Sequence, residues 1–226
     1  MSIGEKFEVI ADEVYEVGKQ DMNEAWWKVH TEDDTRTAYD YGFCRMDFTY
    51  VGGFNPPVKI CPQGNASYMF HRAKGIKEIT SEQLDTSLCT NFTQMFGHIP
   101  NAETISIEKI DTTSASAINS IFIECSGVRN VGKFILKEDG SQTFNEYAFN
   151  SAYGLTSITF EGVIGNNIAF THCDDLTRES ILSIFNALKD YSNTGTTYTI
   201  KFHSVAKARL TDADKAIATQ KGWTII

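Results

Sequence analysis

A phenylalanine followed by the same apolar pattern returns along the middle of this chain at nearly constant spacing. The five copies begin at Phe70, Phe96, Phe122, Phe149 and Phe170, which are 26, 26, 27 and 21 residues apart. Repetition at a period of this length is typical of proteins built from stacked structural units. One unit cannot bury its apolar row alone, so we expect neighbouring units to stack into one continuous core.

The spacing of apolar residues inside each copy predicts the local structure. In the fourth copy Leu155, Ile158 and Phe160 follow Phe149. Alternate residues of a strand point to the same face, so Ile158 and Phe160 predict a short strand. Apolar residues one and four positions before the phenylalanine of the second and third copies predict a short helical turn. Each unit is therefore expected to contain a helical turn, a bend and a short strand, with the strands parallel.

The third copy departs from this pattern. Lys133 stands two residues after Val131, at a position where an inward apolar residue belongs, and Phe134 comes one residue later. A one-residue bulge would return Phe134 to the core. We therefore predict a bulge in this strand.

Residues 1–30 predict helix and self-association. Apolar residues recur there in steps of four, three, four and three, which is the spacing of a coiled-coil seam. A helix this short is marginal in water, so it needs a partner, either copies of itself or the body of the protein. We favour a homo-oligomer, with a trimer preferred, and an attachment role for this segment. The predicted oligomerisation residues are Ile3, Phe7, Ile10, Val14 and Val17.

The segments on either side of the repeat array, residues 66–176, are expected to close its ends. Residues 31–65 are rich in aromatic side chains, and we interpret them as a cap packed on the first repeat rather than as a shelf for stacking sugars. Residues 177–226 predict an α/β cap of two helices and two short strands. In that cap Thr177 is the expected N-cap of the first helix, and Leu210-Thr211 opens the second.

Charge and cysteine content limit the partners of the protein. The net charge of -9 argues against nucleic acid and against anionic membranes. No apolar run is long enough to span a bilayer, and the first residues do not resemble a secretory signal. The five cysteines form no C-x-x-C pair. Cys125 and Cys173 occupy a repeat position that holds alanine or isoleucine elsewhere, so we expect buried free thiols.

Two groups of residues have the composition of a reactive site. The run His-Cys-Asp-Asp at 172–175 could support nucleophilic catalysis, but Cys173 fills a core position. The second group could be interpreted as a set of zinc ligands, although the spacing of its residues matches no standard zinc-site pattern. It comprises Cys61, His71, Cys89 and His98. We therefore expect no catalytic residue, no metal site and no cofactor.

The stretch from Ala148-Phe149 through Ala152, Leu155 and Ile158 resembles the BspA-like class of leucine-rich repeats, whose pattern is A-F-x-x-C-x-x-L-x-x-I. Phe170 and Cys173 keep the cysteine position as well. The two ends of the chain are similar to those of such proteins from gut bacteria and their phages. The resemblance implies an α/β fold: a leucine-rich-repeat solenoid with short parallel strands, an N-terminal coiled-coil-like segment and a C-terminal α/β cap.

The resemblance and the absence of reactive motifs favour a non-enzymatic structural or adhesive protein of a phage virion, a tail fibre or receptor-binding component. The alternative is a bacterial cell-surface adhesin with the same repeats. Expected partners are other virion proteins, through the N-terminal segment, and a host-surface protein or glycan. Solenoids bind through extended faces, so the candidate binding residues are the outward neighbours of the predicted strands. They are Lys77, Thr104, Ser106, Glu108, Ser157, Thr159 and Glu161.

Overall fold

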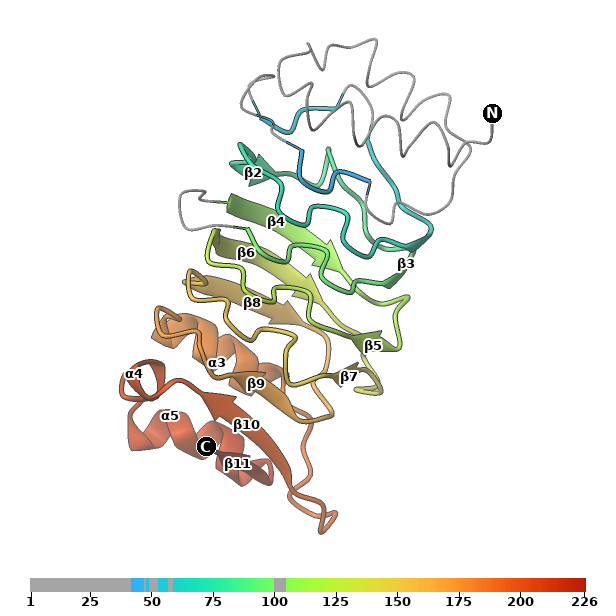
Figure 1. The fold of residues 1–226 in the computed structure, drawn as a ribbon. Helices are drawn as coiled ribbons and strands as arrows, with labels where there is room; N and C mark the ends of the chain where they lie inside the picture. Colours follow the sequence, from blue (N-terminus) through green and yellow to red (C-terminus); the bar gives the residue numbers. More distant parts are fainter. Residues whose placement is uncertain (1–41, 47, 49–52, 57–58, 100–104) are drawn as a thin grey trace.

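A computed structural model of the chain describes residues 42–46, 48, 53–56, 59–99 and 105–226 (Figure 1). The predicted N-terminal helices and oligomerisation residues, Ile3 to Val17, lie outside these ranges, and so does Thr104. Those predictions therefore stay predictions. The described part is mixed α/β, with short parallel strands and few helices.

The largest sheet has four parallel strands in the order β2-β4-β6-β8 (Figure 1). These strands are β2 (Glu78–Ile79), β4 (Ile105–Asp111), β6 (Val128–Ile135) and β8 (Ser157–Glu161). Ile107 pairs with Val131, and Val131 pairs with Ile158, so equivalent residues of successive repeats lie side by side. The predicted parallel stacking of the strands is confirmed.

Shorter strands lie on the opposite side of the core (Figure 1). There β1 (Gly64–Asn65) pairs with β3 (Cys89–Asn91), and β5 (Ala117–Ile118) pairs with β7 (Thr143–Phe144). A three-stranded sheet follows in the order β11-β10-β9. Its strands are β9 (Ile168–Phe170), β10 (Tyr198–Phe202) and β11 (Trp223–Ile225). Every strand pair in the described ranges is parallel.

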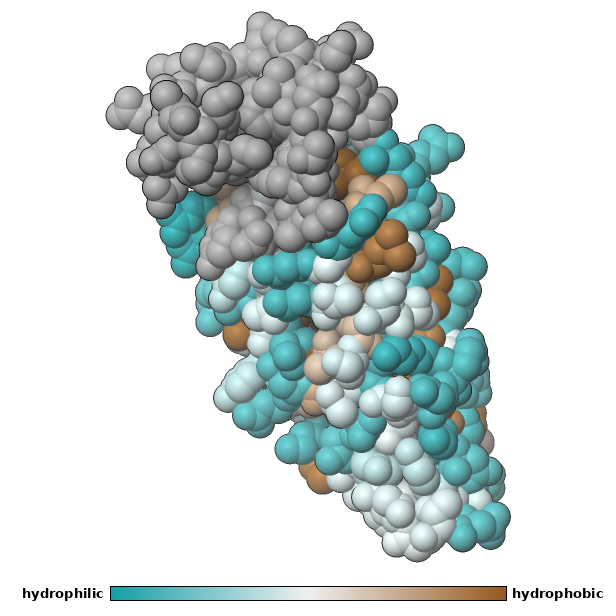
Figure 2. Space-filling view, turned by 90° about the vertical axis from the view of Figure 1, so that its right-hand side faces the viewer, coloured by the Kyte–Doolittle hydropathy of each residue, from teal (hydrophilic) through white to brown (hydrophobic). Residues whose placement is uncertain are grey.

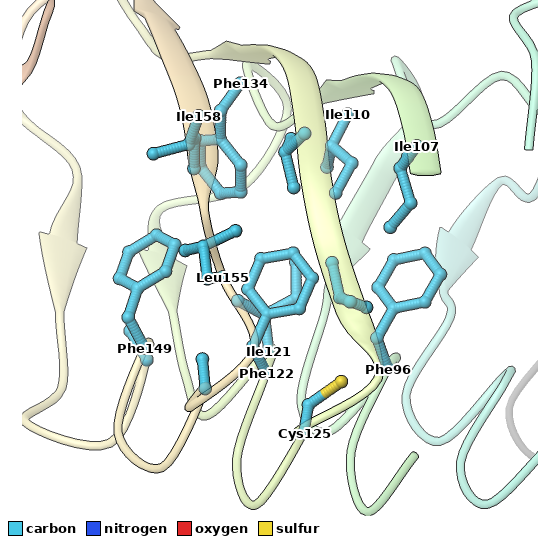
Figure 3. Packing of buried hydrophobic residues seen from close by; sticks show 14 of the residues in the cluster. Phe96, Ile107, Ile110, Ile121, Phe122, Cys125, Phe134, Phe149, Leu155 and Ile158 are labelled. Atoms are coloured by element: carbon cyan, nitrogen blue, oxygen red, sulfur yellow. The ribbon is translucent and has the colours of Figure 1, made fainter. Parts of the chain in front are cut away.

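The repeated phenylalanines form a ladder of rings through the core (Figure 3). Phe70, Phe96 and Phe122 are fully buried, and the distances between successive ring centroids are 5.3 and 5.7 Å. The predicted stack is confirmed, and it is longer than the sequence pattern indicated. Phe43 stacks on Phe70 at 5.4 Å, and Phe202 stacks on Phe170 at 5.6 Å.

The predicted helical turns at the phenylalanines are wrong: these segments are runs of tight turns. An α-helix needs each N–H to bond four residues back. Here the Phe70 N–H donates to the Met95 carbonyl at 2.8 Å, in the next repeat. Two residues after each of the first four repeat phenylalanines the backbone is left-handed, with φ of 57° at both Arg72 and His98. Hydrogen bonds between repeats therefore replace the bonds that a helix would make.

The predicted bulge in the third repeat is confirmed. Val131 pairs with Ile158 and Phe134 pairs with Phe160, so β6 uses one residue more than β8 over the same stretch. Phe134 is buried and Lys133 is exposed.

The C-terminal cap contains α3 (Arg178–Ala187), α4 (Ser204–Lys207) and α5 (Asp212–Gln220). Thr177 is the N-cap of α3, as predicted, and its side chain accepts a hydrogen bond from the Ser180 N–H. Thr211 and Asp214 form a capping box at the start of α5. Both oxygens of Asp214 also bond the Arg178 guanidinium, at 2.6 and 2.9 Å, which joins α5 to α3.

Candidate binding surface

The outward face of the four-stranded sheet carries a row of hydrogen-bonded polar side chains. The Asn130 amide donates to the Ser106 hydroxyl at 3.2 Å, and the Ser157 hydroxyl donates to the Asn130 carbonyl oxygen at 2.9 Å. These residues come from β4, β6 and β8, so the row crosses three adjacent strands. We call this row, with the charged residues beside it, the polar face.

The charged residues of the polar face are engaged with one another or with the backbone. Lys133 and Glu161 form an ion pair at 2.8 Å. A Glu108 carboxylate oxygen accepts the Ser81 backbone N–H at 2.7 Å, and this hydrogen bond holds the pKa of Glu108 below its usual value. The face therefore offers fixed hydrogen-bonding groups, and the charges of Lys133 and Glu161 balance each other.

The structure brings most of the predicted binding residues onto this face and adds two. Ser106, Glu108, Ser157 and Glu161 take part in the contacts above, and Thr159 is exposed on β8. Lys77 is exposed just before β2. Asn130 and Lys133 were not among the predicted residues. The bulge between Val131 and Phe134 shifts the alternation at Lys133, whereas Asn130 precedes the bulge and keeps its register with Ser106 and Ser157.

A second polar group lies along the turns. His98 Nδ1 is 2.9 Å from a Glu124 carboxylate oxygen, and the ring of His71 is 4.7 Å from that of His98. His71 is only 8% exposed, and its Nδ1 has no hydrogen-bond partner in the described chain. Burial, together with the nearby His98, Arg72 and Arg45, lowers the pKa of His71 to about 4. This imidazole is therefore neutral at pH 7.

The buried cysteines belong to the core. Cys173 is fully buried and donates to the Phe149 carbonyl, with the sulfur 3.3 Å from the oxygen. Burial raises the pKa of the Cys125 thiol to about 11 and that of the Cys89 thiol to about 12. Burial also raises the pKa of Cys173. These thiols stay protonated and are poor nucleophiles, and His172 contacts Asn150 rather than Cys173.

No set of three or more His, Cys, Asp or Glu residues is arranged to hold a metal ion within the described ranges. In the same part of the chain, no helix is both long and apolar enough to cross a bilayer. All five cysteines are free thiols.

A groove of about 410 Å³ lies on the other side of the core from the polar face, between β7 and β9–β10. Phe144 and Glu146 line one wall, and Ala169, Thr199 and Lys201 line the other. Figure 2 shows the side of the molecule that carries the short strands: hydrophilic residues dominate, with apolar residues scattered among them. This groove was not predicted from the sequence.

Comparisons with protein-family profiles, with curated proteins and with solved structures find no match to this chain. The resemblance to BspA-like repeats therefore stays a prediction.

Proposed function

We propose that the chain is a non-enzymatic structural or adhesive protein of a phage virion, a tail fibre or receptor-binding component. In this proposal the stacked repeats are a leucine-rich-repeat solenoid of the BspA-like type, and the solenoid is the scaffold on which a binding face is held. Homo-oligomerisation through residues 1–30 would present several copies of that face, which raises avidity without new contacts.

The observation that supports a binding role most directly is the row Ser106–Asn130–Ser157. Its side chains stand on adjacent parallel strands and hold each other in place. Binding of a ligand would therefore cost these side chains little additional conformational entropy. The charges of Lys133 and Glu161 balance each other in an ion pair, which suits a neutral host-surface glycan or a polar protein surface.

Immunogold electron microscopy with antibodies against the purified protein tests the virion assignment. Labelling of particle tails supports the proposal. Labelling of the bacterial envelope without particles favours the alternative, a cell-surface adhesin.

Light scattering tests the oligomer independently. We expect a trimer of the full chain and a monomer after deletion of residues 1–20. A strictly monomeric full chain removes the fibre assignment, and a truncated chain that still forms trimers shows that the predicted seam is not the assembly element.

A further inference from the structure

Tyr153 exposes its ring at a repeat position that the core does not use. The side chain is 49% exposed, whereas the preceding Ala152 is buried. The same position, four residues after the repeat phenylalanine, is polar in three other copies, where it holds Lys74, Ser126 and Asp174. Packing of the repeats therefore does not require an aromatic residue here. An exposed tyrosine, with an apolar ring and a polar tip, is well suited to contact a ligand.

A histidine of the next repeat lies beside this ring. The centroids of the Tyr153 and His172 rings are 5.7 Å apart, and the ring planes are tilted by 37°. His172 Nδ1 contacts the side-chain oxygen of Asn150, which holds the imidazole in place. The tyrosine ring therefore stands next to a second, more polar ring that is already oriented.

The guanidinium of Arg129 is fixed one residue from Tyr153. Its Nη1 donates to the Gly154 carbonyl at 3.1 Å and lies 3.5 Å from a carboxylate oxygen of Asp175. A Cβ on Gly154 would come within 3.1 Å of the same nitrogen, so the glycine leaves the space that the guanidinium occupies. The side chains of Arg129 and Asp175 are still 33% and 57% exposed. A donor and an acceptor are thus held side by side and remain open to a ligand.

This site adjoins the polar face. Val128 and Val131 are both buried, and the two residues between them, Arg129 and Asn130, both turn outward. They can do so because β6 uses one residue more than β4 at this point. Asn130 in turn bonds Ser157 of the polar face. We call the group Tyr153, His172, Arg129 and Asp175 the tyrosine edge, and it is continuous with the polar row.

The tyrosine edge has the chemistry of a site for a neutral sugar. A pyranose has an apolar face of C–H groups that stacks on an aromatic ring, and its hydroxyls each donate and accept hydrogen bonds. An anionic glycan is disfavoured, because Arg129 is already paired with Asp175 and the net charge of the protein is -9. The core of a protein–protein interface is apolar, whereas the side chains that accompany Tyr153 on this edge are polar.

We propose that the tyrosine edge binds a neutral pyranose residue of a host-surface glycan. The sugar ring stacks on Tyr153, and two adjacent hydroxyls bond the Arg129 guanidinium and the Asp175 carboxylate. The next sugar of the chain contacts the polar row at Asn130 and Ser157. This inference rests on the adhesive role proposed above, and it adds the class of ligand and the residues that select it.

A glycan array probed with the full-length protein tests the class of ligand. The array carries neutral glycans that end in glucose, galactose, mannose or N-acetylglucosamine, and anionic glycans that end in sialic acid or a sulfated sugar. We expect binding to neutral glycans. Binding to anionic glycans alone, or to no glycan, overturns the proposal.

Variants of two exposed tyrosines test the position of the site. Titration calorimetry with the best neutral glycan from the array gives the affinity, and circular dichroism shows that each variant is folded. We expect about tenfold weaker binding by Tyr153→Ala, as for loss of an aromatic anchor, and little change in Tyr153→Phe, which keeps the ring. Tyr147→Ala is the matched control, because Tyr147 is 44% exposed and lies outside the tyrosine edge. Equal affinity of Tyr153→Ala and the unaltered protein overturns the proposal.

A further variant separates failure of this inference from failure of the proposed function. If Ser157→Ala weakens glycan binding and Tyr153→Ala does not, the polar face alone is the glycan site. That result overturns the inference and leaves the adhesive role standing. If Tyr153→Ala abolishes binding but immunogold labelling finds no protein on particles, the sugar site is supported and the virion assignment fails.

Discussion

The hydroxyl of Ser180 accepts the backbone N–H of Ile158 at 3.0 Å, so a side chain of α3 stands where the next strand of the main sheet would be. Ser183 does the same for Phe160, also at 3.0 Å. The open edge of β8 is thus closed by two hydroxyls on one helix face. Unpaired sheet edges invite pairing with other chains, and covering an edge with a helix prevents this.

Replacing both serines should therefore destabilise the end of the sheet. In Ser180→Ala/Ser183→Ala the N–H groups of Ile158 and Phe160 lose their acceptors, and we expect a loss of about 1–3 kcal/mol for each buried donor. Urea denaturation followed by circular dichroism measures the change. Ser116→Ala, at an exposed serine, is the control and should change the free energy of unfolding by less than about 0.5 kcal/mol. A double variant as stable as this control would show that the edge is not closed by these hydroxyls.

Phe122 occupies the middle of the ring ladder, and its truncation should be costly. Its ring is fully buried and lies 5.7 and 5.8 Å from the rings of Phe96 and Phe149. We expect Phe122→Ala to lower the free energy of unfolding by about 3–5 kcal/mol, since it removes apolar contacts and leaves a cavity. Phe122→Leu keeps most of the volume and should cost clearly less. A loss below about 1 kcal/mol for the alanine variant would mean that the ladder is not the core.

The elements that were predictable from the sequence are those that each repeat specifies within itself. The alternation at Ile158 and Phe160 identifies a strand, and the misplaced Lys133 identifies the bulge that brings Phe134 inward. Thr177 signals the start of α3 by its own capping chemistry. In each case the sequence signal lies within a few residues of the feature that it predicts.

The features that were missed depend on contacts between repeats. The spacing of Phe92, Met95 and Phe96 fits a helical turn and a run of tight turns equally well, and the deciding hydrogen bonds run to the next repeat. Phe43 joins the ladder although no repeat pattern follows it in the sequence. The groove at Ala169 had one available signal, the shortened step from Phe149 to Phe170. Its meaning depends on how the fourth and fifth repeats stack, which no residue within a single repeat determines.

Gly132 in β6 lies close against the backbone of the neighbouring strand β4. A Cβ at this position would come within 2.5 Å of the Glu108 carbonyl oxygen, which is backbone and cannot move without shifting the strand. We expect Gly132→Ala to cost about 1–3 kcal/mol, as overpacking does in a core. Lys133→Ala, at the neighbouring exposed position, should cost clearly less, because its ion pair with Glu161 is solvated. Equal costs in thermal denaturation would refute the close approach of the two strands.

Acid should destabilise the fold through His71 before the carboxylates titrate. Its pKa is lowered from 6.5 to about 4 in the folded protein, chiefly by burial, so the folded state resists protonation. The stability that depends on the neutral imidazole is complete above pH 6.5 and is lost as the pH falls from 6.5 toward 4. At about 1.4 kcal/mol per pH unit, roughly 2 kcal/mol should be lost by pH 5. His71→Leu removes the titrating group, so urea denaturation between pH 7 and pH 5 should show a smaller loss in this variant than in the unaltered protein. Because Leu cannot protonate, an identical loss in both proteins would assign the acid sensitivity to other groups and leave the buried His71 without a role in it.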